Sequence, residues 1–343
     1  MQPPEMSVVM PAYNAGRYIR EAIQSIQAQS FRRWELIVVD DGSTDDTGTV
    51  AKLLADVDKR IRYVRTDHLG VAKAANKAMR LAKADLIVRM DADDISLPHR
   101  FVTQYDWMRK HPETDLLATK VRCFGEEVGE GLQVYAEWSN SLTTAKSIAA
   151  MRFIDAPVVQ PSVCLRRSVI ENHGAYRDGD FPEDYEAWLR WLDAGVCFEK
   201  INEPLLLWRD HGHKLTRTHS NYSEEAIWRI KGKYFDQWMQ HHGPSDARPL
   251  MIWGSGRKTR SRLDYFGFHE DKHRISSYID IDPRKTGQII EGTPVIRPDE
   301  IPIESGKKPF ILSMVGSRDA RPLIQSYLHK RGFKVEQDYM ILA

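Results

Sequence analysis

The first 90 residues alternate between short apolar runs and stretches whose apolar positions recur every three or four residues. The runs predict strands, and the wider spacing predicts amphipathic helices. Strands are expected at 7–10, 36–39, 61–65 and 86–90, and helices at 19–26, 46–57 and 71–82. The first strand is expected to end at Pro11, because proline cannot donate to a β-ladder. This alternation predicts an α/β fold, a mostly parallel sheet with helices on both faces.

The regular alternation of strand and helix patterns ends after residue 98. Helices are expected at 100–110, 183–194 and 221–241 and strands at 158–165 and 205–208, with the rest of 112–180 irregular. Glycine and proline at 242–246 indicate a linker. Strand patterns at 250–253, 277–280 and 310–313 then predict a second, smaller α/β domain. The expected domains are 1–242 and 245–343.

Polar clusters follow three of the predicted strands where each strand ends, at 13–14, 40–41 and 91–94. The carboxyl ends of parallel strands meet at one edge of a sheet, which is where ligands bind in such folds. Asp91 and Asp93, one residue apart, can face a common ion, and their hard oxygen ligands suit Mg²⁺ or Mn²⁺. An isolated Asp-x-Asp is more often a solvated turn. Its place at a strand end beside two other polar clusters favours the metal site.

The overall composition narrows the classes of protein. The 343 residues carry 49 basic and 48 acidic side chains, so the chain lacks the basic footprint of a nucleic-acid-binding protein. Three widely spaced cysteines indicate a reducing compartment rather than a disulfide framework. No apolar run approaches the roughly 20 residues of a membrane span, and residues 1–5 do not resemble a signal peptide. We expect a cytoplasmic protein; contact with a membrane surface and the oligomeric state stay open.

Four segments resemble, in order and spacing, the successive motifs of glycosyltransferase family 2. They are SVVMPAYN at 7–14, ELIVVDDGSTD at 35–45, GVAKAAN at 70–76 and DADD at 91–94. The resemblance is strong over about 6–110 and weaker to about 220. It implies a GT-A fold, with a nucleotide-binding half at about 6–95 and an acceptor half at about 96–220. It also implies inverting transfer of a sugar from a nucleotide-diphosphate donor with a bound Mn²⁺ or Mg²⁺.

The resemblance assigns roles to individual residues. Those implied to hold the nucleotide are Pro11, Ala12, Tyr13, Asn14, Asp41, Lys73, Asn76 and Asp91. Those implied to hold the metal are Asp91, Asp93 and His211. His211 lies in a segment, 208–216, that resembles the family's Arg-x-His stretch, and the nearby His213 leaves that assignment open. From the residues alone, these positions also fit turns, helix caps and a surface histidine.

A second acidic pair resembles the one that the family carries in its acceptor half. Asp184, in the segment 181–188, takes the position of the catalytic base. Inversion by single displacement needs a carboxylate that accepts the proton of the acceptor hydroxyl. Without the resemblance, the favoured interpretation of Glu183 and Asp184 is a pair of acidic residues well placed at a helix N-terminus. Trp138, Trp188 and Trp191 are candidates for stacking on sugars, although such aromatics more often belong to the core.

The second domain carries part of a dinucleotide-binding fingerprint. Gly254-Ser255-Gly256 follows a predicted strand, and Asp280 ends the next one at about the spacing of a ribose-binding acid. Thr259 occupies the third glycine position. The domain loosely resembles small Rossmann-like domains appended to sugar-modifying enzymes. We expect a structural, interaction or nucleotide-sensing module.

Three hypotheses follow for the whole chain. The first is a metal-dependent, inverting glycosyltransferase that moves a sugar, from a UDP-sugar by preference, to a hydroxyl of a saccharide or glycoconjugate acceptor in polysaccharide biosynthesis. The second is an NAD(P)-dependent oxidoreductase that uses residues 250–282. The third is a non-catalytic protein that binds sugar nucleotides. Because Asp91, Asp93 and Asp184 are all present, the first is favoured.

Overall fold

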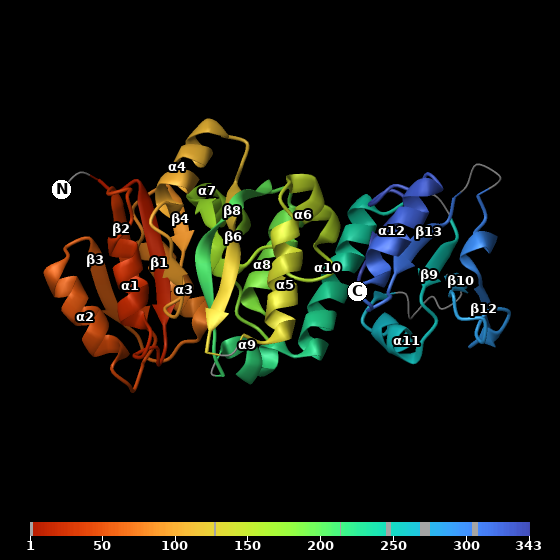
Figure 1. Cartoon of the computed structure of the whole chain (residues 1–343), viewed down its shortest axis with the longest axis horizontal. Coiled ribbons are helices and arrows are strands. Elements are labelled where there is room, and N and C mark those ends of the chain that lie inside the picture. Colours follow the sequence, from red (N-terminus) through yellow and green to blue (C-terminus); the bar gives the residue numbers. More distant parts are fainter. Residues whose placement is uncertain (1–2, 127, 213, 245–247, 268–274, 304–307) are drawn as a thin grey trace. The chain divides into compact units, whose positions relative to one another are not determined.

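The computed structural model describes residues 3–126, 128–212, 214–244, 248–267, 275–303 and 308–343 (Figure 1). The chain divides into two compact units, Met1–Ala149 with Ala156–Tyr222 and Ala150–Asp155 with Ser223–Ala343. This division groups residues 224–242 with the second unit, whereas the sequence placed them in the first domain. The expected start of the second domain at 245 lies outside the described residues, and the domain boundaries stay a prediction.

The first half of the first unit follows the predicted alternation closely. Its elements are β1 (Met6–Ala12), α1 (Ile19–Gln27), β2 (Trp34–Asp40), α2 (Thr47–Val57), β3 (Ile61–Arg65), α3 (Val71–Leu81) and β4 (Leu86–Arg89). The four strands lie in the order β3-β2-β1-β4 and are all parallel. Strands β1 and β4 are buried along their whole length, as expected of strands covered by helices on both faces.

Strand β1 continues through Pro11 to Ala12, so the expected end of this strand was wrong. Pro11 pairs with Val39 of β2. Strand β4 accompanies β1 only as far as Val9. Pro11 therefore lies where β1 has a strand neighbour on one side alone, a position in which the missing N–H of proline is tolerated.

The second half of the first unit is mixed in strand direction. Its elements are β5 (Ile95–Ser96), α4 (Arg100–Lys110), β6 (Leu116–Gly125), α5 (Glu130–Ser141), α6 (Ala145–Met151), η1 (Gln160–Ser162), β7 (Cys164–Arg166), α7 (Arg167–His173), α8 (Glu183–Asp193), β8 (Phe198–Asp210), α9 (Leu215–Thr218) and η2 (Ser220–Tyr222). Strand β7 joins β4 and β6 antiparallel, and β6 and β8 run parallel. The sheet order is β3-β2-β1-β4-β7-β6-β8-β5.

Residues 112–180 are far more regular than the sequence indicated. Strand β6 was missed because Lys120 and Arg122 interrupt its apolar run. Helix α5 was missed because it buries only Ala136 and Ser139 and therefore shows little apolar periodicity. In both elements, tertiary packing decides a conformation that the local pattern leaves ambiguous.

The aromatic residues of α8 belong to the core. Trp188 and Trp191 are completely buried. Their ring centroids lie 5.3 Å apart, and Trp188 makes an edge-on contact with Phe198 at 5.6 Å. Two of the three tryptophans proposed for sugar stacking are thus packing residues. Trp138 is half-buried and its role stays a prediction.

The second unit contains its own sheet. Its elements are α10 (Glu224–His242), β9 (Leu250–Trp253), α11 (Arg257–Leu263), β10 (Ile275–Ile279), β11 (Ile289–Ile290), β12 (Thr293–Ile296), η5 (Pro298–Glu300), β13 (Phe310–Ser313), α12 (Ala320–Lys330) and β14 (Tyr339–Ile341). The order is β11-β12-β10-β9-β13-β14, parallel except for the β11–β12 pair. This agrees with the expected Rossmann-like arrangement. None of the helices in the described ranges is long and apolar enough to cross a membrane.

Candidate active site

Three carboxylates meet directly after β4. Asp91, Asp93 and Asp94 bring ligand oxygens within 4.8 Å of one another. Asp94 is completely buried, and its Oδ1 accepts a 2.8 Å hydrogen bond from the backbone N–H of Arg209. Its Oδ2 has no hydrogen-bond partner among the described residues. Burial, with the charge of Asp93 added to it, raises the pKa of Asp94 well above the usual value.

Asp91 is held by a buried arginine from the strand that precedes it. Arg89 is completely buried, and its Nη2 lies 2.8 Å from Asp91 Oδ1. Its Nη1 donates to the backbone carbonyl of Met90 at 2.6 Å. The Asp91 side chain is about one-third exposed. One face of this carboxylate is therefore fixed by a buried cation while the other remains open to a ligand.

Asp93 is paired with His211. His211 Nε2 lies 2.8 Å from Asp93 Oδ2, and the two side chains are 16% and 21% exposed. Burial opposes ionisation of Asp93, but the hydrogen bond from His211 and the positive charge of Lys214 outweigh it and lower the pKa of Asp93. In a neutral His211 that donates from Nε2 to the carboxylate, Nδ1 is an acceptor. That nitrogen is buried and has no hydrogen-bond partner in the part of the chain that the structure describes.

These residues fit a divalent cation. The donor set is made of hard carboxylate oxygens, which Mg²⁺ and Mn²⁺ prefer. Asp94 Oδ2 is buried without a partner among the described residues, and a buried polar atom left unpaired is costly unless something else satisfies it. The predicted ligands Asp91, Asp93 and His211 are thus brought together at one place. His213 lies outside the described residues.

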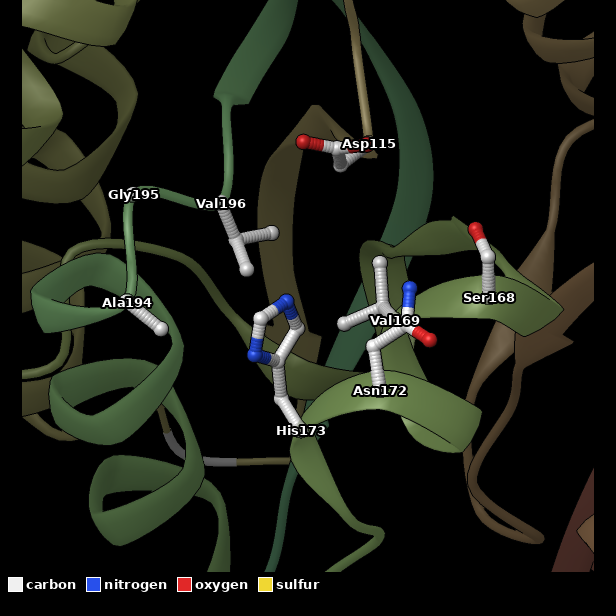
Figure 2. Close-up of a pocket in the computed structure, with 8 residues that line it drawn as sticks. All are labelled: Asp115, Ser168, Val169, Asn172, His173, Ala194, Gly195 and Val196. Atoms are coloured by element: carbon white, nitrogen blue, oxygen red, sulfur yellow. The ribbon is translucent and has the colours of Figure 1, made fainter.

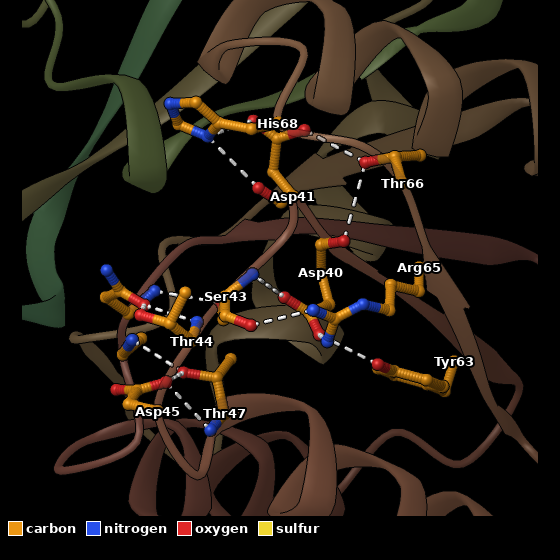
Figure 3. A network of polar contacts seen from close by, with 12 residues as sticks. Asp40, Asp41, Ser43, Thr44, Asp45, Thr47, Tyr63, Arg65, Thr66 and His68 are labelled. Carbon is orange, nitrogen blue, oxygen red and sulfur yellow. Dashed lines mark hydrogen bonds and ion pairs between the residues drawn. The ribbon is translucent and has the colours of Figure 1, made fainter.

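Asp40 and Asp41, at the end of β2, form hydrogen bonds that fix the loops next to this strand (Figure 3). Asp40, which is completely buried, accepts from Ser43 N at 2.9 Å and Tyr63 Oη at 2.7 Å. Asp41 accepts from the backbone N–H groups of Leu69 and Gly70 at 2.7 and 2.8 Å. These bonds fix the turn that leads into α3. Asp41, predicted to bind the base, therefore also has a structural task.

The segment at the end of β1 presents two side chains at the surface. Tyr13 is 48% exposed, and its ring lies against that of His68 with centroids 4.2 Å apart. Asn14 has a positive φ of 47°, and its Oδ1 accepts from Thr44 N at 2.9 Å. Pro11 and Ala12 are buried within β1. Of the four predicted base-binding residues in this segment, Tyr13 and Asn14 have side chains within reach of a ligand.

The two predicted residues on α3 differ in their surroundings. Lys73 is exposed and pairs with Asp178 at 2.6 Å. The side chain of Asn76 makes two bonds with the backbone of Tyr176, donating to its carbonyl at 2.7 Å and accepting from its N–H at 3.1 Å. Asn76 thus clamps the loop that precedes α8. Contact of either residue with a nucleotide stays a prediction.

The head of α8 is linked to the acidic cluster by hydrogen bonds. Arg89 Nη2 donates to Gln160 Oε1 at 3.2 Å, and Gln160 Nε2 donates to Glu183 Oε1 at 3.4 Å. Tyr222 Oη donates to Glu183 Oε2 at 2.7 Å. Glu183 is buried, so this network fixes the first turn of α8.

Asp184 is the next residue of that turn and is half-buried. Its Oδ1 accepts from the backbone N–H of Tyr185 at 2.7 Å. Burial raises the pKa of Tyr222, and the charges of Glu183, Asp184 and Asp91 raise it further. Glu183, the residue before Asp184, is linked through Gln160 to Arg89, the partner of Asp91. The structure brings the predicted base and the acidic cluster into one neighbourhood.

Comparison with known proteins identifies this arrangement. Residues 7–174 match the sequence model of glycosyl transferase family 2. The chain carries a family 2 glycosyltransferase domain. The match covers β1–β4, the acidic cluster and much of the acceptor half. It favours the first of the three hypotheses over an oxidoreductase.

The match to relatives of the family 2 domain covers most of the length of each relative. The chain is 29% identical over 225 residues to the putative glycosyltransferase EpsE of Bacillus subtilis, covering 64% of this chain and 78% of that protein. It is 27% identical over 234 residues to the O-antigen biosynthesis glycosyltransferase WbnJ of Escherichia coli, covering 66% and 87%. Residues 1–349 of S. aureus TarS, in a crystal structure with UDP-GlcNAc, match with a TM-score of 0.52 and 16% identity over 69% of this chain and 73% of that one. This likeness confirms the GT-A fold.

Three basic residues of the family 2 domain's site were not predicted. Arg89 supports Asp91, as described above. Arg209 Nε donates to the backbone carbonyl of Asp93 at 2.6 Å, and Lys214, only 8% exposed, places Nζ 4.2 Å from the centroid of the Trp208 ring. An arginine inside a buried apolar strand is a signal that could have indicated Arg89. Arg209 and Lys214 flank His211 in the 208–216 segment.

One small pocket in the family 2 unit lies apart from the acidic cluster. Its volume is about 80 Å³ and its lining includes Asp115, Val169, His173 and Val196. Figure 2 shows the side chains of Val169, His173 and Val196 pointing toward a common space. Ligand pockets usually enclose about 300–1,000 Å³. This pocket is therefore too small for a nucleotide sugar.

Proposed function

We propose that the family 2 domain transfers a sugar, with inversion, from a nucleotide-diphosphate donor to a hydroxyl of a saccharide or glycoconjugate acceptor. The donor we favour is a UDP-sugar. The observation that carries the proposal is the convergence of three carboxylates after β4 with the head of α8, joined through Arg89, Gln160 and Glu183.

The roles follow from the chemistry of each group. Asp184 accepts the proton of the acceptor hydroxyl while the hydroxyl oxygen attacks the anomeric carbon. The bond from that carbon to the diphosphate oxygen breaks, and the nucleoside diphosphate leaves with the electron pair. Attack from the face opposite the leaving group inverts the configuration.

A divalent cation held by Asp91 and Asp93, with His211 beside them, would neutralise charge on the leaving diphosphate. Arg89 keeps Asp91 oriented. The hydrogen bond from His211 and the charge of Lys214 keep Asp93 ionised at neutral pH, because both lower its pKa. Nucleotide contacts are assigned to Tyr13, Asn14 and Asp41, at the ends of β1 and β2.

The relatives suggest the class of acceptor. WbnJ is named for O-antigen biosynthesis, and a relative in Erwinia amylovora is named for amylovoran biosynthesis. We infer a growing polysaccharide or glycoconjugate as the acceptor here.

The substitution Asp184→Asn tests the base. We expect it to lower kcat by roughly 10²–10⁴-fold, the usual contribution of a general base, while the Kd for UDP changes less than about twofold because Asp184 is not assigned to the donor. Transfer is measured with a panel of UDP-, GDP- and dTDP-sugars plus Mn²⁺. Asp46→Asn, at an exposed aspartate of the same unit, is the matched control. Unchanged turnover would show that the base lies elsewhere, and parallel loss of UDP binding would show a structural role.

A further inference from the structure

The second unit contains a cavity at the carboxyl edge of its sheet. Its volume is about 560 Å³, and residues directly after β9, β10 and β13 contribute to its lining. From β9 the chain first builds outward through β10 to β12, and then returns to place β13 on the other side of β9. The order therefore reverses between β9 and β13. Open α/β sheets bind ligands outside the carboxyl ends of their strands at such a reversal.

The apolar part of the lining is unusually exposed. Ile281, which follows β10, is 79% exposed, and Leu323 of α12 is 71% exposed. Both line this cavity, together with Trp253 and Tyr327, whose ring centroids lie 5.5 Å apart. Large aliphatic side chains gathered around one cavity mark a ligand site rather than ordinary surface. An apolar lining of this kind suits an aromatic base.

The polar part of the lining includes one carboxylate, Asp280, which lies beside a glycine turn and next to Lys285. Asp280 accepts from Ser255, through both its backbone N–H at 3.2 Å and its hydroxyl. It also pairs with Lys285 at 3.1 Å. Burial opposes ionisation, but the bonds from Ser255, Asp282 and Lys285 outweigh it and lower the pKa of Asp280. An ionised acceptor at the end of the second strand suits the paired hydroxyls of a ribose.

The glycine turn leaves room beside that carboxylate. Gly256 has φ −68°, which any residue adopts, and a Cβ added there would meet no heavy atom within 4 Å. Gly254 has φ +110°, and a Cβ there would lie 3.0 Å from Thr259 Oγ1. The turn is thus crowded at Gly254 and open at Gly256, and both glycines line the cavity.

We propose that this cavity binds a ribonucleotide, with its base against Ile281 and Leu323, its ribose hydroxyls at Asp280 and its phosphate beside the Gly254–Gly256 turn. The class is defined by one flat base, a ribose diol and a phosphate. The cavity volume lies within the usual range for a ligand of this size. The site lies wholly within the second unit and is separate from the donor site proposed for the family 2 domain.

The test uses the full chain labelled with 5-fluorotryptophan, so that binding is detected at the cavity itself. The ¹⁹F resonance of Trp253, which lines the cavity, is assigned with Trp253→Phe. UDP, GDP, ADP and NAD⁺ are each titrated in, followed by the 2′,3′-dideoxy form of the tightest ligand. We expect at least one ribonucleotide to shift the Trp253 resonance to saturation and its dideoxy form to bind more weakly. NAD⁺ as the tightest ligand would identify a dinucleotide site, and a diphosphate would identify a mononucleotide site.

Two matched substitutions separate the cavity from the rest of the surface. Ile281→Asp should weaken binding by about tenfold or more, because it removes apolar contact with the base and adds negative charge. Ile289→Asp changes a residue of the same unit that is 73% exposed and lies outside the cavity lining, and should leave binding unchanged. Leu323→Asp provides a second cavity variant. The proposal is overturned if no ribonucleotide shifts the Trp253 resonance at roughly 1 mM, or if Ile281→Asp and Ile289→Asp behave alike.

Discussion

The sheets of the two units share a strand order, but the residues at their carboxyl edges differ: charged in one unit and mainly apolar in the other. The order β3-β2-β1-β4 in the family 2 unit corresponds to β12-β10-β9-β13 in the second unit, and the strands of both series are parallel. Carboxylates follow β2 and β4, and those after β4 are surrounded by the mostly buried cations Arg89, Arg209 and Lys214. Apolar side chains around one carboxylate follow β10 and β13. The topology thus determines where a ligand site forms, and the few residues after each strand determine what it binds.

The carboxyl edges of the two sheets also differ in how deeply their charged side chains are buried. Arg89, Arg209 and Lys214 are all mostly buried around the acidic cluster, so solvent screens their interactions little. Such an edge suits a diphosphate and a cation. The second edge has the exposed Ile281 and Leu323 instead, and its expected gain on binding comes from removing apolar surface from water.

Removing a carboxylate from the acidic cluster of the family 2 unit should give the largest effect, a loss of nucleotide affinity. We expect Asp93→Ala to weaken Mn²⁺-dependent UDP binding by about 100-fold or more, because a ligand of the cation and the partner of His211 are lost together. Calorimetric titration of UDP with and without Mn²⁺ measures this. Asp106→Ala, an exposed aspartate on α4, serves as the control. Full transfer activity of the wild type in EDTA would contradict the metal role.

The buried cation of the charged edge should matter for stability as well. Arg89→Met leaves Asp91 and Gln160 without their shared partner, and we expect the free energy of unfolding to fall by about 2 kcal/mol. This is below the ~3–5 kcal/mol of a fully buried pair, because the Asp91 side chain is about one-third exposed. Urea unfolding measures the change. Arg17→Met removes the exposed pair with Glu126 and should have no measurable effect; equal losses in the two variants would refute the distinction.

The second unit buries an ionisable lysine away from the carboxyl edge of its sheet, and this should make the free energy of unfolding depend modestly on pH. Lys231 on α10 is buried, with Nζ donating to the carbonyls of Ile154 and Leu342 at 3.0 Å each. Burial lowers the pKa of Lys231 from 10.5 to about 7. Between these values the unfolded chain binds more protons than the folded one, so the unfolding free energy rises with pH.

The wild type should therefore gain roughly 1 kcal/mol per pH unit over Lys231→Met between about pH 7 and 10. Chemical unfolding of both proteins across this range measures the difference. Lys233→Met, at an exposed lysine of the same helix, should show no such slope. A Lys231→Met difference that does not change with pH would mean that this lysine stays charged in the folded protein.

Regular alternation made the nucleotide-binding half predictable. β1 to β4 and the helices between them were expected within a few residues of their observed bounds, because covered parallel strands give continuous apolar runs. The placement of Asn14, Asp41 and Asp91 after the carboxyl ends of neighbouring parallel strands followed from the same topology. Asp184 was reached only through resemblance, since two acidic residues at a helix head are ordinary.

The acceptor half, and the residues that support the acidic cluster, were harder to predict from the sequence. β6 and α5 depend on partners distant in the chain, so their local patterns are weak. The network from Arg89 through Gln160 to Glu183 joins positions 71 and 23 residues apart, and no local pattern indicates such a connection. The pairing of Asn76 with the backbone of Tyr176 spans 100 residues and was missed for the same reason.

In the donor site proposed above, Asp41 restricts how the nucleotide preference can be changed. Its carboxylate fastens Leu69 and Gly70 at the entry to α3, so a substitution there alters the fold and the ligand site together. Tyr13, with nearly half of its surface exposed and its ring against His68, has no comparable duty to the backbone. Under the proposed base contacts, variation that changes the preferred base can therefore accumulate at Tyr13, while Asp41 and His68, whose Nδ1 lies 3.1 Å from the Asp41 carbonyl oxygen, are held by the architecture.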